Sequence, residues 1–251
     1  MADNGYVSVN GATTYEENEK ERRKMGCIVE APGLYDGLTA QQNMEARALL
    51  VNADKSRIRD ILATAGLEHA RDRKVKNFSL GMKQRLAIAL AVMHNPELLI
   101  LDEPINGLDP IGIAEVRGFI RELCDATGKT ILISSHILSE ISLLADDIGI
   151  IDHGVLLEEE SLKELEAKNG KYFRFTVSNA ALAANLLQSK LGIQNVQVDS
   201  ANELTVRDLR LDTGAAVRLF VDAGLSVSDA HLYEDTLEDY FKQVTGGEGI
   251  A

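Results

Sequence analysis

The run Leu98-Leu99-Ile100-Leu101-Asp102-Glu103-Pro104 is the most informative stretch of this sequence. Its apolar residues predict a buried β-strand, and the proline stops that strand directly after two adjacent carboxylates. In open α/β sheets, ligands bind at the carboxyl ends of the strands. A carboxylate there can hold Mg²⁺, and its neighbour can orient or deprotonate a water molecule. The run therefore predicts an α/β fold with a candidate site at Asp102 and Glu103, with a purely structural role for the pair as the alternative.

The sequence after this run alternates between helical and strand patterns. Apolar residues at helical spacing between 113 and 123 are followed by a predicted strand over 130–133. Further strands are predicted over 148–151 and 155–157. Strand, helix and strand at this spacing form a βαβ unit, so we expect a mainly parallel sheet.

Three polar segments surround the acidic pair. Phe78-Ser79-Leu80-Gly81-Met82-Lys83-Gln84-Arg85 precedes it and places a hydroxyl and free backbone N–H groups at a helix start, which is a ready anion site. Asn106-Gly107-Leu108-Asp109-Pro110 follows as a polar loop, and Ser134-Ser135-His136 follows the next strand. Taken singly, the first segment would be a helix cap and the histidine a structural residue.

In this order and spacing, the four segments resemble the nucleotide-binding subunit of an ABC transporter. The family contains a signature motif (Ser-x-Gly-x-x-Gln), the Walker B strand, the D-loop and a switch histidine, in this order. The resemblance implies a P-loop NTPase core of the ABC ATPase type, with ATP and Mg²⁺ as cofactors. It covers Tyr6 to about Gly170 well and the rest of the chain weakly.

The resemblance also implies a role for individual residues. Asp102 would be the Mg²⁺-associated carboxylate, Glu103 the general base for the attacking water and His136 the contact to the γ-phosphate. The signature residues Ser79, Gly81 and Gln84 would contact ATP held mainly by a second subunit, and Asp109 would lie at the dimer interface. This geometry implies a head-to-tail dimer with two composite sites.

The segment from Gly26 to Tyr35 resembles the Q-loop region, with Glu30 as a cofactor-binding residue where most members have glutamine. Such a glutamate is similar to the bacitracin-resistance and lantibiotic-immunity type of exporter ATPase. Two positions depart from the family pattern: Met82 replaces the second glycine of the signature, and Ile105 stands where a small or hydroxyl residue is usual.

The pattern changes after Gly170. Strands predicted over 172–177, 196–198, 204–206 and 225–227 alternate with helices over 180–191 and 214–223, and a last helix covers 237–244. This order predicts a small ferredoxin-like α+β module with a packing or regulatory role. We therefore expect an incomplete ATPase domain over 1–170, the module over 171–246 and a flexible tail over 247–251.

The 251 residues contain no P-loop of the form GxxxxGK followed by serine or threonine. Such a loop cradles the phosphates of ATP. Gly128-Lys129-Thr130 does not replace it, because the triplet lies between a helix and the following strand, the reverse of the required order. The chain instead opens with a strand predicted over 6–9 and a turn at Asn10-Gly11. We expect the isolated chain to fold poorly or to bind nucleotide weakly, and three explanations stay open: a wrongly assigned start, a truncated product, or a subunit that supplies one half-site.

Composition limits the function classes. With a formal charge of -13, the chain repels phosphate backbones, so we expect no nucleic-acid partner. The longest apolar run, Leu86 to Met93, is far shorter than the roughly 18 to 20 residues that cross a bilayer. We expect a cytoplasmic ATPase subunit, peripheral on the inner face of the membrane, that drives a separate permease exporting peptide antibiotics or other small molecules. The alternatives are a catalytically silent or regulatory partner subunit and a soluble ABC protein acting on ribosomes or DNA.

Overall fold

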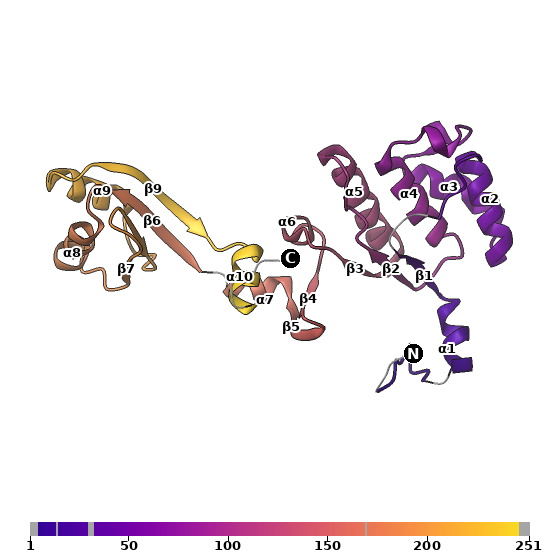
Figure 1. Ribbon diagram of the computed structural model, residues 1–251, viewed down its shortest axis with the longest axis horizontal. Coiled ribbons are helices and arrows are strands. Elements are labelled where there is room, and N and C mark those ends of the chain that lie inside the picture. The colour runs from indigo at the N-terminus through magenta and orange to yellow at the C-terminus, as the bar shows by residue number, and fades with distance from the viewer. Residues whose placement is uncertain (1–4, 14, 30–32, 169, 246–251) are drawn as a thin grey trace. The chain divides into compact units, whose positions relative to one another are not determined.

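The computed structural model describes residues 5–13, 15–29, 33–168 and 170–245. Its contacts divide the chain into two compact units, Met1–Ile137 and Leu138–Ala251, each of which is described by itself (Figure 1). This division follows contacts alone, so the domain boundaries predicted from the sequence remain predictions. No helix in the described ranges is long and apolar enough to cross a membrane.

A three-stranded parallel sheet forms the centre of the first unit. Its strands are β1 (Met25–Ile28), β2 (Leu98–Asp102) and β3 (Thr130–Ser134), in the spatial order β1-β2-β3. The α/β fold and the parallel pairing predicted around the acidic pair are therefore confirmed. The register aligns Asp102 with Ser134, so β2 and β3 end side by side.

Helices supply the rest of the first unit. They are α1 (Tyr15–Arg22), α2 (Ala40–Val51), α3 (Ile58–Thr64), α4 (Leu80–Ala91) and α5 (Pro110–Thr127), with short 3-10 turns at Lys55–Arg57, Glu68–Ala70 and Val75–Asn77. Leu99 and Leu101 of β2 are fully buried, as are Leu86 of α4 and Ile120 of α5. Alternate residues of β2 therefore face the apolar core of the unit.

The other side of the three-stranded sheet is much less covered. Cys27, Ile100 and Leu132 are register partners across the three strands. Cys27 is exposed, Ile100 is half-buried and Leu132 is 60% exposed. We call these three residues the open row. Among the described residues β3 pairs with β2 alone, so one edge of β3 is unpaired.

Two predictions about strands are wrong. Residues 6–9 form no strand: Val9 and Ala12 make an isolated bridge around the Asn10-Gly11 turn, and Tyr6 and Val7 are exposed. The strands predicted to extend the parallel sheet, β4 (Asp147–Asp152) and β5 (Val155–Ser161), instead pair with each other as an antiparallel hairpin.

This hairpin belongs to a small apolar cluster in the second unit. Ile148 and Ile150 of β4 pack with Leu165 of α7 (Leu162–Lys168) and with Leu237 of α10 (Leu237–Val244). The short helix α6 (Leu138–Ile141) packs against the same cluster. The capping pair predicted at the start of α7 is present, since Ser161 Oγ lies 2.7 Å from the Glu164 carboxylate.

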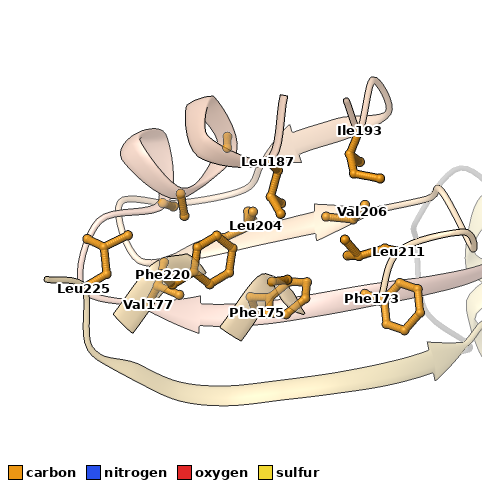
Figure 2. Packing of buried hydrophobic residues seen from close by; sticks show 14 residues of the cluster. Phe173, Phe175, Val177, Leu187, Ile193, Leu204, Val206, Leu211, Phe220 and Leu225 are labelled. Atoms are coloured by element: carbon orange, nitrogen blue, oxygen red, sulfur yellow. The ribbon is translucent and has the colours of Figure 1, made fainter. Parts of the chain in front are cut away.

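The rest of the second unit has the predicted ferredoxin-like order. Strands β6 (Lys171–Val177), β7 (Val196–Val198), β8 (Glu203–Val206) and β9 (Val227–Glu234) alternate with helices α8 (Ala180–Leu191) and α9 (Thr213–Asp222). The antiparallel sheet has the order β7-β8-β6-β9. Figure 2 shows the core, in which Phe175 and Phe220 meet edge to face at 5.5 Å between ring centroids. The last strand, β9, begins and ends later in the sequence than the predicted range 225–227, and it is longer.

His94 follows α4 and contacts the backbone at the start of β1. Its Nε2 lies 3.1 Å from the Met25 carbonyl oxygen, and burial lowers the pKa of the imidazole. The unfolded chain therefore takes up the imidazole proton at a higher pH than the folded chain does, so stability falls as pH falls below about 6.5 toward the lowered pKa of His94. We expect His94→Gln to flatten the stability profile between about pH 7 and 5, measured by urea unfolding.

The control for this variant is His69→Gln, which removes a solvent-exposed histidine of the same unit. An equal flattening in both variants would show that His94 is not the source of the acid sensitivity.

Candidate functional site

The carboxyl ends of β2 and β3 bring four polar residues together. Ser134 Oγ donates a hydrogen bond of 2.5 Å to Asp102 Oδ1 and accepts one of 3.0 Å from the Glu103 backbone N–H. His136 follows β3, and its Nδ1 lies 3.0 Å from Glu103 Oε2. Asp102, Ser134, Glu103 and His136 therefore form one connected chain, which we call the acidic cluster.

The backbone at Glu103 is what turns its side chain toward His136. Glu103 has a φ of +48°, in the left-handed region where a residue with a Cβ is strained. The hydrogen bonds from its N–H to Ser134 hold this conformation. Strain of this kind concentrates at functional sites, where the surrounding structure fixes it.

The acidic cluster is partly open to solvent, so a ligand could reach it. The side chains of His136 and Glu103 are 48% and 31% exposed. The chemistry offered here is one carboxylate held by a hydroxyl, a second carboxylate able to accept a proton, and an imidazole beside it. Within the described ranges no group of three metal-ligating side chains occurs. Mg²⁺ does not need one, because it is commonly held by one or two carboxylates together with substrate phosphates.

A second group of predicted residues lies where α4 and α5 begin. Ser79 is the N-cap of α4, with its hydroxyl accepting from the Met82 N–H at 3.2 Å. Asp109 is the N-cap of α5, with Oδ1 accepting from the Gly112 N–H at 2.9 Å. A Cβ on Gly81 would lie 3.2 Å from the Gly112 Cα, so this glycine allows the two helices to approach closely. Ser79, Gly81 and Asp109 thus have local structural roles as well.

The structure describes one of the remaining two predicted residues, Gln84, but not the other, Glu30. Gln84 is buried in α4, and its Nε2 has no hydrogen-bond partner within the described part of the chain. The neighbouring Arg85 bonds the Ala65 carbonyl and the Glu115 carboxylate, both at 2.8 Å. Glu30 lies outside the described residues, so the structure gives no geometry for it.

The structure therefore brings the predicted residues together in two groups. Asp102, Glu103 and His136 meet directly, and the signature residues Ser79 and Gly81 lie in the first turn of α4, beside the start of α5. Ser134 is the member that sequence reasoning missed. The available signal was register: a hydroxyl residue ends the strand next to the one that ends in Asp102.

Comparisons with known proteins agree with this architecture. The family model described as ABC transporter matches residues 1–106. The bacitracin transport ATP-binding protein BcrA of Enterococcus faecalis is 44% identical over 241 residues, covering 95% of this chain and 78% of that protein. The chain belongs to the ABC transporter family of ATP-binding subunits. A comparison with solved structures agrees. The ATP-binding subunit of an ABC transporter aligns with this chain with a TM-score of 0.55 and 29% identity, covering 66% of this chain and 70% of that one.

A second relative within the family covers less of the chain. The lantibiotic transport ATP-binding protein SrtF of Streptococcus pyogenes is 49% identical over 161 residues, which is 62% of this chain and 70% of that protein. Family membership, the ABC ATPase fold and the role as an ATP-binding subunit predicted from the four motifs are therefore confirmed.

Proposed function

We propose that this chain is the ATP-hydrolysing subunit of an exporter that removes peptide antibiotics through a separate membrane subunit. The observation that carries the proposal is the acidic cluster, in which Glu103 is held beside His136 at the ends of two adjacent parallel strands. Relatives named for bacitracin and lantibiotic transport support the class of cargo.

Each residue of the acidic cluster has a proposed role. Asp102 holds Mg²⁺, directly or through water, and Ser134 fixes the orientation of its carboxylate. Glu103 orients the attacking water and accepts its proton, while His136 contacts the γ-phosphate. When bound, Mg²⁺ neutralises charge on the phosphates of ATP.

The partners follow from the second group of residues. Ser79, Gly81 and Gln84 would face ATP bound mainly by a second ATPase subunit, with Asp109 at the dimer interface. The Q-loop segment, including Glu30 and the 60% exposed Tyr35, would be the coupling surface toward the permease. In this arrangement the subunit sits at the inner face of the membrane, attached through the permease.

Ser134→Ala tests whether the acidic cluster acts as a unit. Removing a residue that orients a metal-associated carboxylate commonly costs 10- to 100-fold in activity, so we expect ATP hydrolysis by the assembled transporter to fall by about that factor. Ser139→Ala removes an exposed hydroxyl nearby in sequence and serves as the control. Equal activity in both variants would contradict a role for Ser134.

The transport function is tested by expressing the chain with its permease in an antibiotic-sensitive bacterium. We expect the minimal inhibitory concentration of bacitracin or of a lantibiotic to rise, and Asp102→Asn to abolish that rise. Asp222→Asn, at the exposed end of α9, should leave it unchanged. If resistance to neither class rises, the proposal that peptide antibiotics are the transported substrates is wrong.

A second candidate function is a catalytically silent partner that supplies only the signature half-site. The position of Ser79 and Gly81 at the start of α4, where they would face ATP held by the other subunit, favours it. In that case, an assembled transporter should lose nothing when Glu103 is replaced but should lose activity when Ser79 is replaced by a bulky residue.

A further inference from the structure

The four-stranded sheet of the second unit has one apolar face and one polar face. Phe173, Phe175 and Val177 of β6 belong to the core beneath α8 and α9 (Figure 2). Because side chains alternate along a strand, Tyr172 and Arg174 point to the opposite face. Their register partners on β9 are Tyr233 and His231.

Aromatic and cationic side chains meet on this opposite face. The rings of Tyr172 and Tyr233 stack at 5.8 Å, and the His231 ring meets the Tyr233 ring edge to face at 5.1 Å. The Arg174 guanidinium lies over both tyrosine rings, 5.5 Å from the centroid of Tyr172 and 4.9 Å from that of Tyr233. Arg207 lies 5.2 Å from the centroid of Tyr172. We call Tyr172, Arg174, Arg207, His231 and Tyr233 the tyrosine–arginine cluster.

Arg174 differs from its neighbours in how its charge is balanced. Lys171 pairs with Glu234 at 3.1 Å, and Arg207 approaches Asp235 at 3.8 Å. No carboxylate of the described residues lies within ion-pair distance of Arg174, which donates a hydrogen bond of 3.3 Å to the Tyr172 hydroxyl.

Asp239, whose carboxylate feels the charge of Arg174, is already engaged elsewhere. It accepts hydrogen bonds from Thr236, the N-cap of α10, at 2.9 Å from the Thr236 N–H and 2.7 Å from its hydroxyl. Hydrogen bonds from Thr236 are the main reason that the pKa of Asp239 is lowered, and the charge of Arg174 adds least. Arg174 therefore keeps its positive charge without an ion-pair partner among the described residues, although the chain has a net charge of -13.

We propose that the tyrosine–arginine cluster binds a small ligand that carries an oxyanion, either a carboxylate or a phosphate. The planar guanidinium of Arg174 presents parallel N–H donors that match such a group bidentately. Arg207 lies over the same Tyr172 ring, and His231 is the register partner of Arg174 on β9. The two tyrosine rings fix the orientation of Arg174, so little conformational freedom is lost when the ligand binds. The site is separate from the acidic cluster in sequence and in chemistry.

Intrinsic tyrosine fluorescence provides a direct test, because the chain has six tyrosines and no tryptophan. The full chain is titrated with inorganic phosphate in one experiment and with glutarate in another, and sodium chloride at matched ionic strength is the reference. We expect a saturable change with a dissociation constant of about 1 mM or below for at least one anion.

Three variants locate the binding. Arg174→Met is expected to weaken binding at least tenfold, and Arg174→Lys to weaken it measurably because lysine lacks the planar fork. Arg218→Met, on the exposed side of α9, is the matched control and should bind as the wild type does. Circular dichroism checks the fold of each variant, and Arg174→Lys decides the outcome if Arg174→Met does not fold.

The outcomes separate clearly. Saturation by phosphate alone, by glutarate alone or by both supports the proposal and identifies the anion. If neither anion gives a saturable change, there is no such site and the proposal is overturned. Equal binding by wild type and Arg174→Lys also overturns it, because the planar donor pair is then not involved.

Discussion

Replacing Glu103 with glutamine is expected to lower the rate of ATP hydrolysis by the assembled transporter at least about 100-fold. A general base contributes typically 10²- to 10⁴-fold, and glutamine cannot accept the proton of the attacking water. The substitution keeps the size of the side chain and a polar atom for His136, which lies 3.0 Å from Glu103 Oε2. Nucleotide binding should therefore persist while turnover is lost.

The measurement is phosphate release from the transporter purified with its membrane subunit. Glu122→Gln, an identical change on the exposed side of α5, controls for the altered charge and should keep full activity. If Glu103→Gln hydrolyses ATP as fast as the wild type, Glu103 is not the base, and the silent-partner alternative gains support.

Phe175→Ala is expected to produce the largest loss of stability in the second unit. Phe175 is fully buried at the centre of the ferredoxin-like core, edge to face with Phe220. Truncating a buried phenylalanine to alanine commonly costs about 3 to 5 kcal/mol, from lost apolar burial and the cavity left behind. Such a loss is a large part of the roughly 5 to 15 kcal/mol that stabilises a typical domain.

Because contacts divide the chain into two units, a measurement that reports on each unit by itself is needed, and hydrogen exchange followed by mass spectrometry provides it. Protection of β6 and β8 should fall in Phe175→Ala, whereas that of β2 should not change. Leu209→Ala removes a leucine that is 55% exposed in the same module and should shift stability by less than about 0.5 kcal/mol. Unchanged protection of β6 in Phe175→Ala would mean that this core does not hold the module together.

The elements that sequence predicts well are those whose local pattern and tertiary environment agree. The strand ending in Asp102 is a continuous apolar run closed by a proline, and the Ser79 cap and the Ser161 to Glu164 pair each satisfy backbone groups within one turn of their own helix. Such signals do not depend on distant partners. The meeting of Asp102, Glu103 and His136 was likewise predictable, because parallel strands end at one edge of a sheet.

The features that sequence misses depend on pairing between distant segments. One local signal was available but was not used in predicting the parallel sheet: the two residues His153-Gly154, with φ of +46° and +77°, separate the strands over 147–152 and 155–161 as in a tight hairpin. Strand β9 extends to Glu234 because its residues pair with β6, although polar residues such as Ser228 and Asp229 weaken its own β pattern. The role of Ser134 became visible only when register placed it opposite Asp102.

The open row has a consequence for handling the protein. Cys27, the half-buried Ile100 and Leu132 form an apolar strip on the sheet, and the edge of β3 that no described strand pairs with has backbone donors and acceptors beside it. Exposed apolar surface next to a free strand edge is a template for sheet-to-sheet association. We expect the purified chain to self-associate through this strip and edge as its concentration rises, in spite of its high net negative charge.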